Sequence, residues 1–193
     1  MTHIPRFRTV TRRLMASACL GLGLFMSAES GTAQTLDPEN TLYLDLEYGR
    51  VVIELRPDLA PNHVARIKEL AREGYYDGVV FHRVIEGFMA QTGDPTGTGS
   101  GGSGQKLKAE FSLEPHVRGT VSMARAQHPD SADSQFFIVF KESDWLNGQY
   151  TVWGHVVEGM EYVDMIKKGP LPSGVVDEPD TLIRMQVAAD VAE

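Results

Sequence analysis

Cysteine is almost absent from this sequence, since Cys19 is the only one among its 193 residues. A single thiol excludes an internal disulfide framework and a zinc site built from several thiolates. The chain is nevertheless long enough for one globular domain to bury a sizeable hydrophobic core without such crosslinks. We therefore expect a soluble single domain whose stability comes from packing.

Basic residues are also few: 18 lysines and arginines stand against 26 aspartates and glutamates, a formal net charge of −8. Nucleic-acid binding is driven largely by basic side chains that displace counterions from phosphates. A chain of this sign lacks such a surface, so the sequence argues against DNA or RNA as a partner.

The sequence has no apolar run long enough to cross a membrane comfortably. Its longest, residues 14–28, has 15 apolar or small residues, whereas a spanning helix needs about 20. Basic residues precede this run and small residues follow it, which predicts a secretory signal peptide over residues 1–33, cleaved between Ala33 and Gln34. The basic residues are Arg6, Arg8, Arg12 and Arg13.

Cleavage would leave a domain of residues 34–193 with a net charge of −11, because four arginines and one glutamate are removed with the signal. An uncleaved membrane anchor is the alternative. A twin-arginine signal is disfavoured because Met15 and Ala16 stand where bulkier apolar residues are preferred, so we expect the general secretion route. Cys19 lies too early in the apolar run for lipidation, and no stable membrane association is expected after cleavage.

Period-two and helical patterns divide the domain into short elements. Three leucines alternate with other residues in the first half of segment 42–55, and a Tyr-Gly turn separates them from a second apolar run, which predicts a β-hairpin. Apolar residues at helical spacing predict helices over 62–74 and 158–168. Five further strand-sized apolar runs are 79–85, 120–124, 135–140, 151–157 and 181–187.

Two helices among seven or eight short strands favour a closed or nearly closed β-barrel capped by helices, with a β-sandwich as the alternative. The glycine-rich segment 97–104 formally contains a dinucleotide-binding fingerprint, but it neither follows an apolar strand nor begins a helix. We interpret it as a surface loop whose glycines adopt positive φ angles.

Familiar catalytic motifs are missing, including the metalloprotease helix, the nucleophile elbow and the Walker loop. Metal-assisted and serine hydrolase chemistry are therefore disfavoured. The histidines of the domain also lack the spacing of metal ligands; they are His63, His82, His116, His128 and His155.

Segment 81–95, FHRVIEGFMAQTGDP, is different because it places Arg83 among aromatic and apolar residues around a glycine turn. A charged group in such surroundings is costly unless it is used. The alternative is a strand arginine whose stem lies on apolar surface while its head pairs with a nearby acid.

This segment resembles the signature of the cyclophilins, a family of peptidyl-prolyl cis-trans isomerases. Further segments agree with the family in order and approximate spacing over residues 42–191. The resemblance implies a mainly β fold, a closed eight-stranded antiparallel β-barrel capped by two α-helices, and rotamase activity on X-Pro bonds. The agreeing segments are YGRVVIEL, GYYDGVVFHRV, the GTGSGG loop, GTVSMARA, SADSQFFIVF and DWLNGQYTVWGHVVEGM.

The resemblance also implies the site residues. It places the catalytic arginine at Arg83, with Phe88 and Gln91 beside it. Arg125 stands where many members have asparagine. Two departures matter more: Tyr150 stands where well-studied eukaryotic members have histidine, and segment 127–133 is about one residue longer than in them. The substrate-binding positions correspond to Met89, Ala124, Arg125, Ala126, Phe137, Trp145, Leu146 and Tyr150.

Three aromatic or titratable residues that lie close to site residues in the sequence are expected to be structural. His82 alternates with Arg83 on the expected strand and should therefore point to the opposite face. Phe136 and Trp153 are expected in the core rather than in the site.

Family resemblance implies a monomer that acts on proline-containing polypeptides without a metal, nucleotide or redox cofactor. Together with the signal peptide, it predicts an isomerase that assists folding of exported proteins in a bacterial periplasm. Trp145 corresponds to a family position associated with binding of the cyclic peptide inhibitor cyclosporin. The alternative function is a non-catalytic peptide-binding module or chaperone on the same fold.

Overall fold

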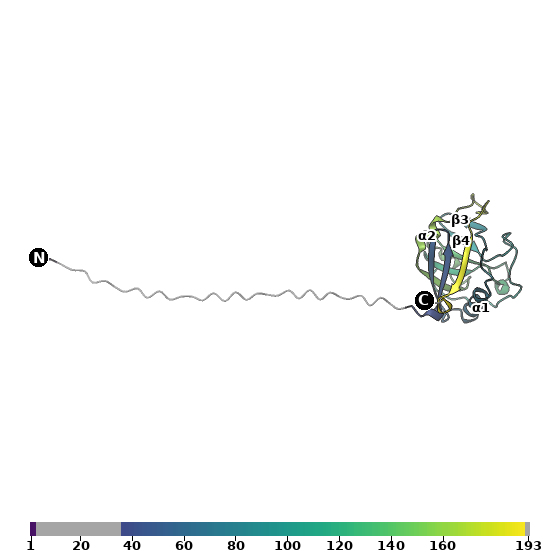
Figure 1. The fold of residues 1–193 in the computed structure, drawn as a ribbon, viewed down its shortest axis with the longest axis horizontal. Coiled ribbons are helices and arrows are strands. Elements are labelled where there is room, and N and C mark those ends of the chain that lie inside the picture. Colours follow the sequence, from purple (N-terminus) through teal and green to yellow (C-terminus); the bar gives the residue numbers. More distant parts are fainter. Residues whose placement is uncertain (3–35, 192–193) are drawn as a thin grey trace. The chain divides into compact units, whose positions relative to one another are not determined.

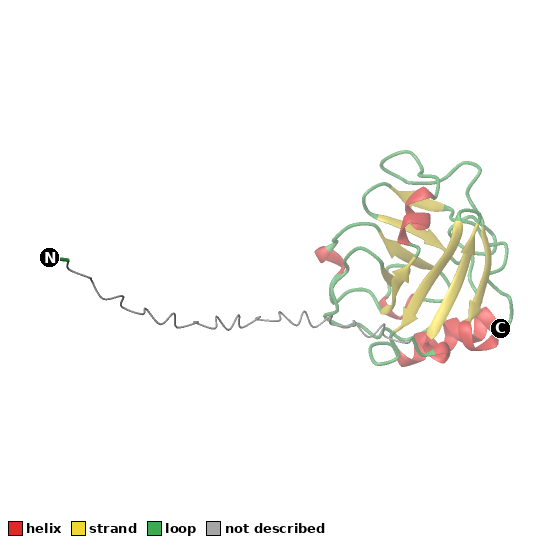
Figure 2. Cartoon of the chain, turned by 60° about the vertical axis from the view of Figure 1, so that its left-hand side comes forward, coloured by secondary structure: helices red, strands yellow, loops and turns green. Residues whose placement is uncertain are grey.

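The computed structural model describes residues 1–2 and 36–191, so the predicted signal peptide lies outside the described residues apart from its first two. Residues 36–191 form one curled, eight-stranded antiparallel sheet with two α-helices (Figure 1 and Figure 2). The strand order is β3-β4-β6-β5-β7-β2-β1-β8. The strands are β1 (Thr41–Leu46), β2 (Gly49–Leu55), β3 (Arg83–Ile85), β4 (Met89–Thr92), β5 (Thr120–Met123), β6 (Phe136–Val139), β7 (Val152–Glu158) and β8 (Leu182–Val187).

The helices form where the sequence pattern predicts them. Helix α1 (Pro61–Arg72) packs against β8 through its buried apolar face, and Gly74, with φ of 68°, follows its end. Helix α2 (Met160–Met165) packs against β2 and is shorter than predicted, because Gly159 is left-handed and Ile166, with ψ of 132°, is no longer helical. No helix within the described part of the chain is long and apolar enough to span a membrane.

The predicted hairpin over 42–55 is confirmed as β1 and β2, and the sheet is continuous, which excludes the two-sheet sandwich. The prediction of a closed barrel is not confirmed, because the ladder stays open between β3 and β8. A loop takes the place of a neighbouring strand at the outer edge of β3. The N–H of Val84 donates to the carbonyl of Gly174 at 2.7 Å, and the N–H of Gly169 donates to the carbonyl of Val84 at 2.9 Å.

Strand β6 is buried on both faces, which explains its unbroken apolar sequence. Phe136 and Ile138 point into the main core, whereas Phe137 and Val139 belong to a second, smaller apolar cluster. Successive strand residues face opposite sides of a sheet, so the second cluster lies on the face away from the main core. Trp153 is fully buried with its ring 5.4 Å from that of Phe136, so both predicted core aromatics are confirmed.

Candidate active site

The pairing of four strands places a row of side chains on one face of the sheet. Arg83 on β3 lies opposite Gln91 on β4, Gln91 lies opposite Phe137 on β6, and Phe137 lies opposite Ser122 on β5. Directly opposed residues of antiparallel strands point to the same side. The register therefore brings Arg83, Gln91 and Phe137 together from three segments of the sequence.

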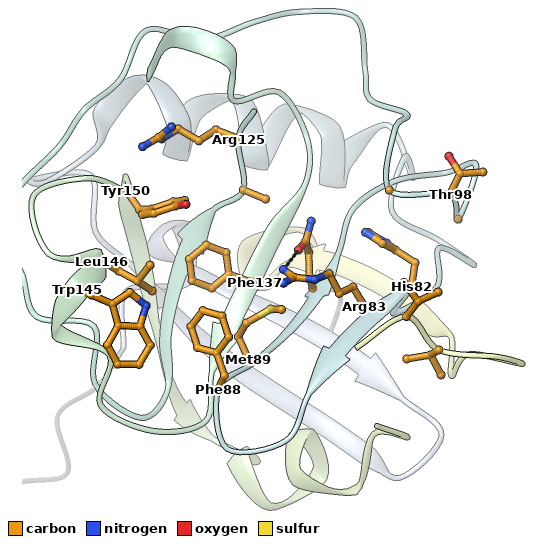
Figure 3. A pocket seen from close by; sticks show the side chains of 16 residues that line it. His82, Arg83, Phe88, Met89, Thr98, Arg125, Phe137, Trp145, Leu146 and Tyr150 are labelled. Carbon is orange, nitrogen blue, oxygen red and sulfur yellow. Dashed lines mark hydrogen bonds between the residues drawn. The ribbon is translucent and has the colours of Figure 1, made fainter. Parts of the chain in front are cut away.

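A pocket of about 510 Å³ lies over this row (Figure 3). Every predicted site residue lines it except Ala126, which lines a neighbouring depression. The lining residues that the sequence analysis named are Arg83, Phe88, Met89, Gln91, Ala124, Arg125, Phe137, Trp145, Leu146 and Tyr150.

Neutral acceptors orient the guanidinium of Arg83. Its Nη1 group donates to Oε1 of Gln91 at 3.2 Å, and its Nε group donates to the carbonyl of Ser173 at 3.1 Å. None of the ion pairs found among residues 36–191 includes Arg83, so pairing with a nearby acid is not observed there. Within the described part of the chain, the charge of Arg83 is therefore uncompensated and lies beside the apolar floor of the pocket.

The apolar part of the pocket is built from aromatic contacts. Phe137 is only 5% exposed, and the ring of Tyr150 meets it edge to face with centroids 5.7 Å apart. His116 stacks on Phe137 at 6.3 Å, and its Nδ1 and Nε2 atoms are hydrogen-bonded to Asn147 and Ser122. These contacts give the floor of the pocket a fixed aromatic surface.

A second aromatic pair forms the outer rim of the pocket. Phe88 follows the turn at Gly87, whose φ is 69°, and its ring lies 5.6 Å from that of Trp145. Trp145 is 63% exposed, in contrast to the buried Trp153. Figure 3 shows Phe88 and Trp145 together at the side of the pocket away from His82.

The expected orientation of His82 is wrong, because this residue lines the same pocket as Arg83 (Figure 3). Strand alternation does not apply, since β3 begins at Arg83 and residue 82 precedes the ladder. His82 is 7% exposed, and neither ring nitrogen has a hydrogen-bond partner within the described residues. Burial lowers the pKa of His82, which favours the neutral ring.

Gln135 is a site-forming residue that the sequence analysis missed. Its Oε1 accepts a hydrogen bond from Nε2 of Gln91 at 2.9 Å, and its Nε2 donates to the carbonyls of Gly99 and Gly101 at 3.1 and 2.8 Å. Its place two residues before Phe137 offered a signal, because residues two apart on an extended chain share a face. Gly97, Thr98 and Gly99 also line the pocket and belong to the loop that agrees with the family, whereas the lining residues Val175 and Val176 carried no sequence signal.

The glycine-rich loop beside the pocket is held by a buried carboxylate. Asp94 accepts hydrogen bonds from the N–H and hydroxyl of Thr96 and from the N–H groups of Gly99 and Gly101. Gly97 and Gly99 have φ angles of 67° and 83°, which confirms the predicted positive φ. Burial alone would raise the pKa of Asp94, but the hydrogen bonds from Gly101, Thr96 and Gly99 lower it to about 2.

The curled antiparallel sheet, its two helices and the arginine beside an aromatic pocket define a cyclophilin-like protein. A family model described as "Cyclophilin type peptidyl-prolyl cis-trans isomerase/CLD" matches residues 41–188. A "Probable peptidyl-prolyl cis-trans isomerase" of Brucella suis is 53% identical over 189 residues, which cover 90% of this chain and 96% of the relative. "Peptidyl-prolyl cis-trans isomerase B" of Bacillus subtilis is 46% identical over 132 residues, or 67% of this chain and 92% of that protein.

Solved structures agree with these relatives. Cyclophilin AquaCyp293 from Hirschia baltica has a TM-score of 0.73 and 30% identity, covering 81% of this chain and 77% of that one. A Cryptosporidium parvum cyclophilin, solved in the presence of the dipeptide Ala-Pro, has a TM-score of 0.71 and 31% identity, covering 76% and 98%. The chain belongs to the cyclophilin-type family and is a peptidyl-prolyl cis-trans isomerase.

Asp94→Asn should destabilise the protein at pH 7 by about 2 kcal/mol, because an amide cannot accept all the hydrogen bonds that the carboxylate accepts. The folded-state pKa of about 2 lies below the ordinary value of 3.8. The stabilisation by the charged carboxylate is therefore complete above that ordinary value and is lost as the pH falls towards 2.

Urea unfolding at pH 7 and near pH 2.5 measures this difference, with the exposed Asp177→Asn as the matched control. We expect the difference in the free energy of unfolding between wild type and Asp94→Asn to become smaller at the lower pH. An equal difference at both pH values would contradict the assigned role of the carboxylate.

Proposed function

We propose that the pocket holds the proline of an X-Pro segment while Arg83 stabilises the twisted peptide bond. The uncompensated charge of Arg83 beside the apolar floor is the observation that carries this proposal. The Ala-Pro dipeptide named with the Cryptosporidium structure supports proline-containing polypeptides as the substrate class.

The chemistry requires no bond to be broken. Rotation about an X-Pro bond is slow because the nitrogen lone pair is delocalised into the carbonyl, with a barrier of about 18–20 kcal/mol. In the twisted state this lone pair is localised on nitrogen and can accept a hydrogen bond. Arg83 remains protonated and donates one, so it stabilises the transition state more than either planar form.

The remaining pocket residues would hold the two ends of the segment differently. The proline ring would lie on the apolar surface of Phe88, Met89, Phe137 and Leu146, which excludes water from the reacting amide. Gln91 and the main chain of the wall at 124–126 would hold the flanking peptide. One side of the X-Pro bond is then fixed while the other rotates.

A non-catalytic peptide-binding module or chaperone would need the same apolar groove but no charge beside it. The orientation of Arg83 by Gln91 and Ser173, without a neutralising acid, favours catalysis over binding alone. Residues of a single chain supply every role described, so a monomer without a cofactor is sufficient for the proposed reaction.

The N-terminal residues support a site of action outside the cytoplasm. The family match begins at residue 41, so residues 1–33 precede it. Their basic, apolar and small-residue regions have the order of a cleaved signal. We place the mature protein in a bacterial periplasm, where it would accelerate folding of exported proteins without a stable membrane attachment.

Arg83→Ala should lower isomerase activity by roughly 100-fold or more, as expected when a main electrostatic donor is removed from a transition state. Its Tm should stay within a few degrees of wild type, because the side chain is only partly buried and makes no ion pair. A protease-coupled peptide assay and thermal unfolding measure the two effects. Arg184→Ala, on exposed β8 surface, is the control, and full activity of a folded Arg83→Ala variant would refute the role of Arg83.

Mature protein recovered from its native cells should begin at Gln34 or within a few residues of it. Intact-mass spectrometry of the soluble periplasmic fraction measures the N-terminus directly. A soluble cytoplasmic species that retains Met1 would contradict the proposed export.

Cyclosporin should inhibit the enzyme, since Trp145 presents a large apolar face and one N–H donor at the rim. We expect weaker inhibition than in family members with histidine at the position of Tyr150, because the opposite part of the rim differs. Trp145→Phe should weaken inhibition and retain isomerase activity, as measured by inhibitor titration. Trp153→Phe, in the buried core, should affect mainly stability, and unchanged inhibition of Trp145→Phe would show that Trp145 lies outside the inhibitor site.

A further inference from the structure

The side chain of Arg125 turns back onto the protein instead of reaching across the pocket. Its Nε and Nη2 groups both donate to the carbonyl of Gln149, each at 3.1 Å. Its Nη1 group donates to the carbonyls of Ala126 and Gln127 at 3.0 and 3.2 Å. All three nitrogens of the guanidinium are thus engaged, so few of its five N–H donors remain for a substrate.

These hydrogen bonds join two walls of the pocket at the point where the β-ladder ends. Strands β5 and β7 stay connected as far as the N–H of Met123, which donates to the carbonyl of Thr151 at 3.0 Å. Two residues further on, no main-chain hydrogen bond between Arg125 and Gln149 is found in the described region. The guanidinium provides that connection instead.

Arg125 also contacts the aromatic floor through Tyr150. Its guanidinium carbon lies 4.7 Å from the centre of the Tyr150 ring, and Tyr150 meets Phe137 edge to face. Figure 3 shows Arg125 and Tyr150 on one side of the pocket and Arg83 on the other. A cation over an aromatic face stabilises that ring orientation.

We infer that Arg125 is a positioning residue that fixes the spacing of the two walls and holds Tyr150 against Phe137. The inference rests on the proposed function, since it assumes that the X-Pro segment binds in this pocket. The main chain at residue 125 keeps the substrate-binding role that family resemblance implies, and the side chain holds that main chain in place. Arg125 acts through the Gln149 carbonyl and the Tyr150 ring, and the substrate meets the wall that these contacts hold in place.

Arg125→Ala should weaken binding of an Ala-Pro-containing peptide by roughly fivefold. The cis-trans exchange rate of the bound peptide should stay within about twofold of the wild-type rate, because a pre-organised wall binds the planar and twisted forms alike. Peptide titration followed by NMR gives Kd and the exchange rate from the same folded sample. A merely structural role would lower stability without changing Kd per folded molecule.

Arg125→Lys tests the paired hydrogen bonds of the guanidinium separately from its positive charge. Lysine keeps the positive charge but cannot donate two parallel hydrogen bonds to one carbonyl, so it should bind the peptide nearly as weakly as the alanine variant. Arg118→Ala is the matched control. Arg118 is exposed, pairs with Asp164 and donates to the carbonyl of Phe140, but it does not line the pocket. Its Kd should equal that of wild type.

A double-mutant cycle with Tyr150→Leu decides how Arg125 acts. Because Arg125 acts through the Tyr150 ring as well as the Gln149 carbonyl, Arg125→Ala should raise Kd by only about twofold once that ring is absent, instead of about fivefold. Independent, multiplying effects, or wild-type affinity of Arg125→Ala or Arg125→Lys, would overturn the inference. A wild-type protein that binds the peptide without exchange would refute the proposed function alone.

Discussion

The Arg83 guanidinium is oriented by an amide and a main-chain carbonyl, and the rest of the site depends on this choice of neutral acceptors. A carboxylate would orient it equally well, but it would compensate the charge that the proposed catalysis needs. In an apolar pocket, an uncompensated donor interacts strongly with a lone pair that appears only in the twisted state. Water or an acidic partner at the same place would weaken that interaction.

The open edge of the sheet contributes directly to this orientation. The register of β3 and β4 places Gln91 opposite Arg83, and the loop that covers the outer edge of β3 brings in the carbonyl of Ser173. A closed ladder between β3 and β8 would leave no place for that loop. Strand β6 contributes to the core with one face and to the pocket with the other, since Phe136 faces the main core and Phe137 forms the pocket floor.

Local patterns in the sequence are sufficient to predict elements that bury one face, such as the β1-β2 hairpin and α1. The signature segments also located most of the pocket, because their residues lie on neighbouring strands whose register brings them together. The closed barrel is not confirmed and the orientation of His82 differs from the expectation, since both depend on how the segments on either side of β3 continue beyond it. Val175 and Val176 could not be foreseen, because only a distant loop contact brings them to Arg83.

Exchange NMR of an X-Pro peptide with a catalytic amount of the purified protein tests the central claim most directly. Uncatalysed isomerisation takes tens to hundreds of seconds, so exchange cross peaks between the cis and trans forms are absent at short mixing times without a catalyst. We expect the protein to produce these cross peaks and to leave the cis-to-trans ratio of the free peptide unchanged. Peptide resonances that shift on binding while the cross peaks stay absent would contradict the claim.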